Sequence, residues 1–270
     1  MTAENRAALA TAPGASTLVL LSGMLGDESL WRGVLQRLDP LTEALCLRSD
    51  SRSTVGEVAA AVLDTAPSSF ALAGHSFGGI VALEVQRQAP DRVVRLALLS
   101  ASARAGSPAQ QEGWAALRSR TLAGEFTTVA AELAVATLPA HHRTSELVAQ
   151  NLAMADVVGS AGLLRQLTAQ VTRPDSRPRL AGIAIPTTVV IGESDEVCPP
   201  GLQHEVARSI PGAVTEVIAG TGHMSPLEAP DEVAEVLRTW LSATTTPQHP
   251  VTDRTHNPSH PRCPHDEESL

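Results

Sequence analysis

A serine flanked by glycines stands at residues 74–79, where it could act as a nucleophile. The peptide Gly74-His-Ser-Phe-Gly-Gly79 contains the pattern G-x-S-x-G. The apolar run 69–74 before it is typical of a strand, and segment 77–89 after it is typical of a helix. Strand, glycine-rich turn and helix together make a nucleophile elbow, whose glycines admit a strained turn. Ser76 would then lie at a helix N-terminus, which stabilises developing negative charge; the alternative is a glycine-rich turn with a serine cap.

A serine hydroxyl becomes a good nucleophile only when a base takes its proton and an acid orients that base. His223 follows the predicted strand 213–218 in a glycine-rich loop. We predict that His223 is the base. His75, beside the nucleophile, is expected to pack or hydrogen-bond within the elbow. Three further histidines are expected to lie at the surface: His141, His142 and His204.

Asp195 is the predicted acid. It follows the β-branched strand 187–192, which places it between the serine and the histidine in the chain order usual for elbow serines. Glu193 and Glu196 are the alternatives, and would otherwise be solvated loop residues. Segment 100–107, which follows an earlier strand and could also supply the acid, has no carboxylate. That absence favours Asp195.

Two backbone N–H groups are expected to form an oxyanion hole. One belongs to Phe77, directly after the nucleophile, and the other should lie in an early strand-to-helix loop. The predicted strand Thr17–Leu21 is followed by the loop Ser22-Gly-Met-Leu-Gly26. Gly23 permits a turn there, and the N–H of Met24 is the predicted second donor. The alternative is a plain connecting turn.

The surrounding elements alternate between strands and helices. Expected strands are Thr17–Leu21, Ala44–Leu47, 70–74 and Val93–Leu99, and expected helices are 29–38, 54–65 and 77–89. Such alternation predicts an α/β fold with a mostly parallel central sheet flanked by helices. Ligands of such sheets bind beyond the carboxyl ends of the strands, where all the candidate residues fall.

At this point the chain resembles the alpha/beta-hydrolase superfamily. The resemblance spans nearly all of 16–241 and rests on four pieces: Leu21-Ser-Gly-Met-Leu-Gly-Asp-Glu-Ser-Leu-Trp31, Gly74-His-Ser-Phe-Gly-Gly79, Pro186-Thr-Thr-Val-Val-Ile-Gly-Glu-Ser-Asp195 and Gly222-His-Met-Ser-Pro-Leu-Glu-Ala-Pro230. It is most similar to small bacterial esterase-like members, such as pimeloyl-ACP methyl ester esterases and related carboxylesterases. The resemblance implies hydrolysis of an ester or thioester through an acyl-enzyme, with no metal or organic cofactor. Many relatives carry His-Gly where this chain has Ser22-Gly23.

From 108 to 180 the strand pattern disappears and apolar residues recur at helical spacing. This insertion resembles the helical cap of the superfamily, which roofs the site. Residues expected to contact the substrate are Gly23, Leu25, Leu138, Met154 and Met224. The insertion also carries arginines that either face an anionic acyl group or form an ordinary solvated helix surface: Arg118, Arg120, Arg143, Arg165 and Arg173.

These patterns divide the chain into four parts. We expect 16–107 and 181–242 to form the hydrolase core, 108–180 the cap and 1–15 a loose lead-in. Segment 243–270 is rich in Pro, Thr and His and is expected to be disordered, because it has too little apolar surface to offset its ordering entropy. Its histidines and Cys263 fit no zinc spacing.

Composition excludes several other functions. A net charge of −9 with 20 basic residues, all of them arginine, argues against nucleic acids and anionic membranes as partners and against lysine Schiff-base chemistry. Three scattered cysteines predict a cytoplasmic protein, and no segment reads as a signal peptide or membrane span. Two other functions stay open: a lyase or C–C bond enzyme that uses the same serine and histidine, and a non-catalytic ligand receptor. The oligomeric state is not predicted.

Overall fold

Six parallel strands form the central sheet of the protein. The computed structural model describes residues 17–40 and 42–243. The strands are β1 (Thr17–Leu21), β2 (Ala44–Leu47), β3 (Phe70–His75), β4 (Val93–Leu99), β5 (Thr187–Gly192) and β6 (Val214–Ile218). Their order in the sheet is β2-β1-β3-β4-β5-β6, and every neighbouring pair is parallel. The predicted α/β fold is confirmed.

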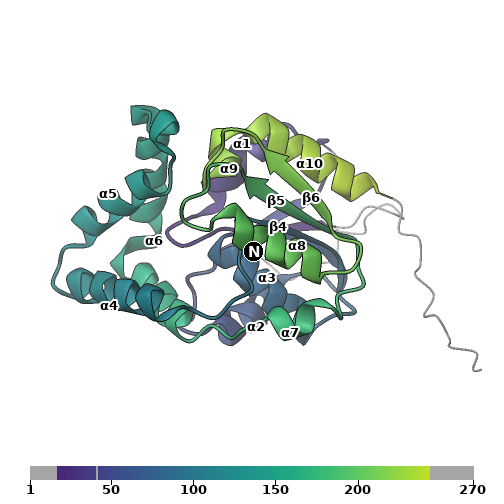
Figure 1. Ribbon diagram of the computed structural model, residues 1–270, viewed down its shortest axis with the longest axis horizontal. Coiled ribbons are helices and arrows are strands. Elements are labelled where there is room, and N and C mark those ends of the chain that lie inside the picture. Colours follow the sequence, from purple (N-terminus) through teal and green to yellow (C-terminus); the bar gives the residue numbers. More distant parts are fainter. Residues whose placement is uncertain (1–16, 41, 244–270) are drawn as a thin grey trace, which may run out of the picture.

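Helices cover both faces of this sheet, because side chains of successive strand residues point to opposite faces. In β1, Val19 and Leu21 join one apolar cluster, whereas Leu18 and Leu20 join the other. The first cluster packs under α2 (Val55–Thr65), α3 (Phe77–Gln88) and α8 (Pro200–Ser209), and the second under α1 (Arg32–Leu35) and α10 (Pro230–Ser242). The result is a three-layer arrangement with the sheet in the middle (Figure 1).

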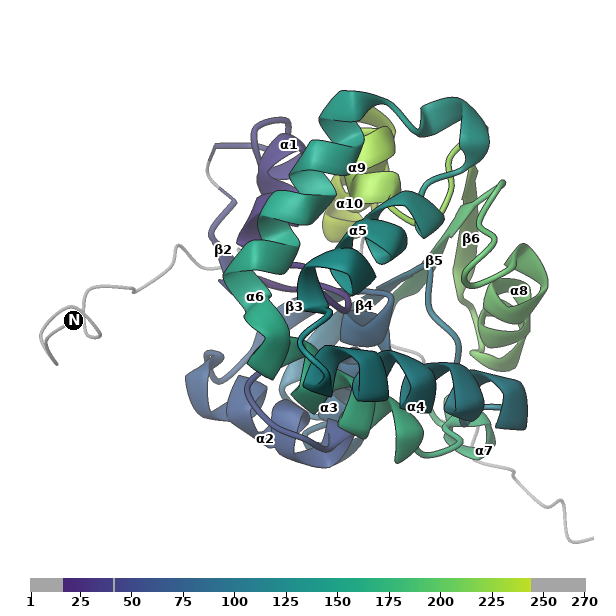
Figure 2. The ribbon, with the colours of Figure 1, turned by 90° about the vertical axis from the view of Figure 1, so that its left-hand side faces the viewer.

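The regular elements between β4 and β5 are all helices. They are α4 (Pro108–Leu122), α5 (Phe126–Ala136), η3 (Ala140–His142), α6 (Ser145–Val171) and α7 (Arg177–Leu180). Helices α4, α5 and α6 lie together to one side of the sheet and stand in front of it in Figure 2. They enclose a small apolar cluster of their own around Val129, Leu163 and Leu167.

One expected helix differs from the sequence prediction. Segment 29–38 was expected to form one continuous helix, but it contains a 3-10 turn, η2 (Glu28–Trp31), followed by the single turn of α1. Asp27 caps η2 by accepting hydrogen bonds from the N–H and hydroxyl of Ser29. Gly33 inside α1 has low helix propensity, which disfavours a longer helix.

Helix α6 is longer than any apolar segment expected from the sequence. It is the one described helix long and apolar enough to cross a membrane by length and composition, with a mean hydropathy of 1.4. The helix is kinked at Gly159, and it packs against α4 and α5. The predicted lead-in 1–15 and the predicted tail beyond Ala243 lie outside the described residues.

Candidate active site

The turn between β3 and α3 holds Ser76 in a strained conformation. Its φ of 53° and ψ of −117° lie where side chains rarely go. The neighbouring glycines are required by space. A Cβ on Gly74 would meet the carbonyl of Gly78, and one on Gly78 would meet the carbonyl of Leu21. The tight packing around the turn leaves no room for another backbone conformation. Strained residues usually persist only where the surrounding structure holds them in this way.

Ser76, His223 and Asp195 come together beyond the ends of three different strands. The Ser76 hydroxyl lies 2.8 Å from Nε2 of His223, and Nδ1 of His223 lies 3.0 Å from both carboxylate oxygens of Asp195. A carboxylate can only accept, so Nδ1 carries a hydrogen and donates a hydrogen bond to Asp195. Nε2 is then free to accept from Ser76, which is the arrangement of a nucleophile, its base and an orienting acid.

Asp195 is held rigidly in a buried position. Its Oδ1 accepts from the N–H groups of Val197 and Cys198 at 3.0 and 2.8 Å, and Oδ2 accepts from Gln203 at 3.1 Å. Burial opposes its ionisation, but the charge and hydrogen bond of His223, together with the hydrogen bond from the N–H of Cys198, outweigh burial and lower the pKa of Asp195. Ser100 adds to the same effect, although its hydroxyl falls short of hydrogen-bond geometry. The carboxylate is therefore kept charged.

The loop that carries His223 is fixed by two buried side chains. Nε2 of His75 donates to the carbonyl of His223 at 2.7 Å, and burial, with a smaller contribution from His223, lowers the pKa of His75 to about 3. Glu228, whose side chain is fully buried, accepts from the N–H groups of Gly222 and Met224 at 2.8 and 2.9 Å. Hydrogen bonds thus fix the backbone of His223 and of the residues directly before and after it.

The loop after β1 lies against the elbow. Among the described residues, the N–H groups of Met24 and Phe77 have no hydrogen-bond partner. The next N–H, that of Leu25, donates to Oε1 of Gln166 at 3.0 Å, and Leu25 has a φ of 58°. Gly23 allows this approach, because a Cβ there would lie 2.9 Å from Nδ1 of His75. Two unpaired donors are therefore available beside Ser76.

A cavity of about 180 Å³ opens above these residues, between the sheet and the inserted helices. Ser76 and His223 line it from the core, and helices α4, α5 and α6 contribute the opposite wall. The apolar part of the wall is formed by Met24, Leu25, Ile80, Trp114, Ala130, Leu133, Ala134, Ala136, Met154, Ala155, Val197, Leu202 and Met224. Such a lining suits an apolar group next to a reactive carbonyl.

The sequence was also compared with known proteins. The sequence model of the alpha/beta hydrolase family matches residues 11–236. The chain belongs to this family. Among alpha/beta hydrolases, it is 28% identical over 247 residues to a putative carbamate hydrolase, RutD, of Azorhizobium caulinodans, covering 83% of this chain and 91% of the relative. It is 25% identical to a pimeloyl-[acyl-carrier protein] methyl ester esterase of Photobacterium profundum, covering 84% and 94%.

A solved structure agrees with this membership. A hydrolase from Pseudomonas aeruginosa PA01 superposes with a TM-score of 0.75 at 26% identity, covering 86% of this chain and 92% of that one. The predicted resemblance is confirmed, and the relatives support hydrolase activity for this alpha/beta hydrolase.

Two predicted substrate contacts are not part of the cavity wall of this alpha/beta hydrolase. Gly23 packs directly against His75 and Ser76 below the cavity. Leu138 is 1% exposed and joins the core cluster beside the sheet. The other three predicted contacts, Leu25, Met154 and Met224, do line the cavity.

The remaining candidates are placed away from the cavity. Glu193 is exposed and accepts from the N–H of Gly220 at 2.9 Å, and Glu196 is also exposed. His142 is not a free surface residue as expected, since its Nδ1 lies 2.7 Å from Glu228. No group of three metal-ligating side chains occurs within 17–40 and 42–243. Of the three candidate acids, only Asp195 contacts His223.

Three supporting residues were missed by the sequence analysis. Gln203 holds Asp195, Glu228 holds the His223 loop and Gln166 holds the loop after β1. Each is a polar side chain at an ordinary position of a helix. Their roles depend on contacts with residues far away in the chain or across a loop, and no local sequence pattern marks such contacts.

Proposed function

We propose that this alpha/beta hydrolase is a serine esterase or thioesterase that works through an acyl-enzyme. The observation that carries the proposal is the continuous contact from Ser76 through His223 to Asp195, at 2.8 and 3.0 Å, on the floor of a mostly apolar cavity. A receptor has no need of an ordered nucleophile, base and acid.

The proposed reaction follows from these positions. Ser76 attacks the substrate carbonyl while its proton passes to Nε2 of His223, and Asp195 stabilises the imidazolium that forms. The N–H groups of Met24 and Phe77 would bind the oxyanion of the tetrahedral intermediate. His223 then gives the proton to the leaving alcohol or thiol. A water molecule, deprotonated by the same nitrogen, releases the acid and restores Ser76.

The helical insertion is proposed to act as a cap that selects the acyl group. Its helices supply most of the apolar wall opposite Ser76. The cavity volume of about 180 Å³ favours small to medium acyl groups. Relatives are named as a carbamate hydrolase and as a methyl ester esterase, so esters, thioesters and carbamates belong in the first substrate panel.

A fluorophosphonate probe tests the proposal directly. We expect one probe molecule per chain, attached to Ser76, and no labelling of Ser76→Ala or His223→Ala. Ser102→Ala is the matched control, because Ser102 lines the same cavity without contacting His223 and its loss should leave labelling intact. In ester hydrolysis, Ser76→Ala should lower kcat by about 10⁴-fold or more.

Two results would contradict this mechanism. Hydrolysis by Ser76→Ala at the wild-type rate would rule out the acyl-enzyme. Failure of the folded wild type to react with the probe would instead favour a lyase or a receptor, since neither needs Ser76 to attack as a nucleophile and form an acyl-enzyme.

A further inference from the structure

Arg173 is a buried cation in the wall of the cavity. It lies two residues beyond the end of α6 and is 8% exposed. It is the one side chain with a permanent charge among the described residues that line the cavity. Buried arginines are ordinarily paired with a carboxylate, because an isolated buried charge is costly. A buried arginine in this position is therefore expected to bind an anionic group.

Among the residues that the structure describes, the partners of Arg173 are all neutral. Its Nη1 donates to Oε1 of Gln170 at 2.8 Å, and its Nη2 reaches Oε1 of Gln110 over a long 3.4 Å. The guanidinium lies 5.0 Å from the centre of the Trp114 ring. The buried Nε has no hydrogen-bond partner. The planar guanidinium of Arg173 thus retains N–H donors for which the described residues offer no acceptor.

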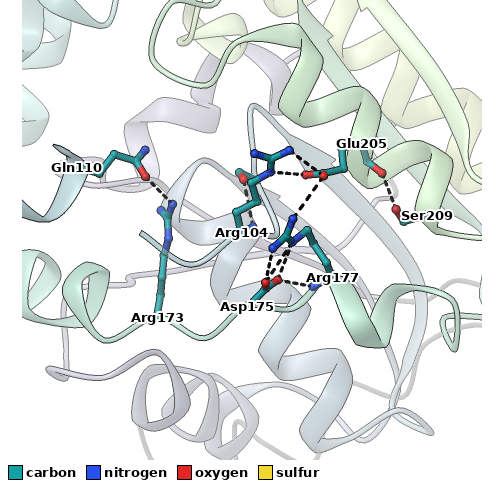
Figure 3. A network of polar contacts seen from close by, with 8 residues as sticks. Arg104, Gln110, Arg173, Asp175, Arg177, Glu205 and Ser209 are labelled. Atoms are coloured by element: carbon teal, nitrogen blue, oxygen red, sulfur yellow. Dashed lines mark hydrogen bonds and ion pairs between the residues drawn. The ribbon is translucent and has the colours of Figure 1, made fainter. Parts of the chain in front are cut away.

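Neighbouring carboxylates are already occupied by other arginines. Asp175 is bound by Arg177, and Glu205 is bound by Arg104 at 2.7 Å and by Arg177 at 3.7 Å. Figure 3 shows this network beside Arg173, whose own contact runs to Gln110.

The electrostatic surroundings agree with this isolation. Burial lowers the pKa of Arg173, and no carboxylate among the described residues offsets this effect. On the surface of the insertion, by contrast, Arg120 pairs with both Glu125 and Glu132. Arg173 therefore lacks the carboxylate partners that a surface arginine of the same insertion has.

We propose that Arg173 binds a carboxylate of the substrate, so that the enzyme acts on esters that carry a second, anionic carboxylate group. This proposal rests on the proposed esterase function. A carboxylate matches the geometry of a guanidinium, which can donate two parallel hydrogen bonds to it. The described cavity wall offers a single cation, which suits a monoanion better than a doubly charged phosphate.

Matched esters test the preference. Monoethyl adipate and ethyl hexanoate share the ester and the length of the alkyl chain, but only the first ends in a carboxylate. We expect the wild type to prefer the anionic ester in kcat/KM by about 10- to 100-fold, the effect of a charge-assisted hydrogen bond. Arg173→Met, which keeps an apolar stem against Trp114, should abolish this preference.

Arg118→Met is the matched control, because Arg118 lies on the exposed surface of α4 and not in the cavity wall. It should keep the wild-type ratio of the two esters. A wild type that hydrolyses both esters equally well, or an Arg173→Met variant that keeps the preference, would overturn the proposal.

Binding separates this inference from the esterase mechanism. In Ser76→Ala, calorimetry should detect binding of adipate monoamide, which carries one carboxylate, but not of hexanoic acid amide, and the second substitution Arg173→Met should remove the adipate monoamide signal. If the wild type hydrolyses neither ester and the probe leaves Ser76 unlabelled, the esterase function fails, but selective binding of adipate monoamide would still support the carboxylate site at Arg173. Ester hydrolysis without binding of adipate monoamide would leave the esterase function intact and refute the carboxylate site.

Discussion

His75 shows how one buried residue can serve the site without taking part in the chemistry. Its ring is 2% exposed, and its Nε2 donates to the carbonyl of His223. Nδ1 has no partner. Because the pKa of His75 is lowered to about 3, the ring is neutral at any ordinary pH. It orients the loop of His223 through a hydrogen bond that does not depend on the charge state of the site.

The lowered pKa of His75 makes a prediction about stability. The unfolded chain binds a proton at His75 below about pH 6.5, whereas the folded chain does so only near pH 3. Acid therefore favours the unfolded state in this window, and this group alone removes about 1.4 kcal/mol from the free energy of unfolding for each pH unit below 6. His75→Gln keeps a donor but cannot titrate, so its stability should fall less steeply.

Urea unfolding at pH 7, 5.5 and 4.5 measures this difference. Groups remote from His75 titrate alike in both proteins, so the difference between the two slopes reports on His75 and its immediate neighbours. Parallel slopes would show that the ring is not kept neutral by burial.

At the scale of elements, the strands of the core could be predicted closely, whereas for the insertion only its helical character could be predicted. β1, β2 and β4 have the predicted boundaries, because each is a short apolar run bounded by residues typical of turns. The positions of Ser76, Asp195 and His223 follow from strand ends. The insertion gave only helical periodicity, which does not say which face of a helix meets the cavity. Arg173 and Leu138 therefore could not be assigned from sequence.

The kink in α6 is the feature that lets one helix line the cavity along its length. Gly159 has a φ of 69° and a ψ of 174°, a conformation open essentially only to glycine. Met154 before the kink and Gln170 after it both line the cavity. A straight helix would turn one of the two halves away, so the kink is part of the shape of the site.

Replacing Gly159 should reveal this strain. No atom lies within 4 Å of a Cβ placed on Gly159, so the cost of Gly159→Ala comes from the backbone alone, about 1–3 kcal/mol. Gly113→Ala in α4 is the matched control, since its Cβ also meets nothing and its backbone is helical. It should stabilise the protein by about 0.5–1 kcal/mol. Denaturant unfolding should thus give opposite signs, and equal signs would refute the strain.

For the whole molecule, the candidate site depends on contacts between the core and the insertion. Gln166 of α6 holds Leu25 of the core, and Arg165 donates to the carbonyl of Asp50 at 2.6 Å. His142 of η3 lies 2.7 Å from Glu228, which brackets the His223 loop. The insertion therefore does more than cover the cavity, since it fixes two of the loops that surround Ser76.

Gln166 offers the sharpest test of that coupling. It is fully buried, does not line the cavity, and accepts from Leu25 while its Nε2 lies 3.4 Å from the hydroxyl of Ser49. Gln166→Met keeps the shape but leaves the Leu25 N–H unpaired, which should cost about 1–3 kcal/mol of stability. The loop that carries Met24 would then lose its fixed position beside Ser76.

If Met24 is an oxyanion donor, this loosening acts on the transition state more than on substrate binding. We therefore expect kcat of Gln166→Met to fall about 10-fold or more, with little change in KM. Gln150→Met on the exposed surface of the same helix should change neither value. A raised KM with an unchanged kcat would mean that Gln166 acts on the substrate instead. Lower stability with unchanged kinetics would show that the loop after β1 does not depend on the insertion.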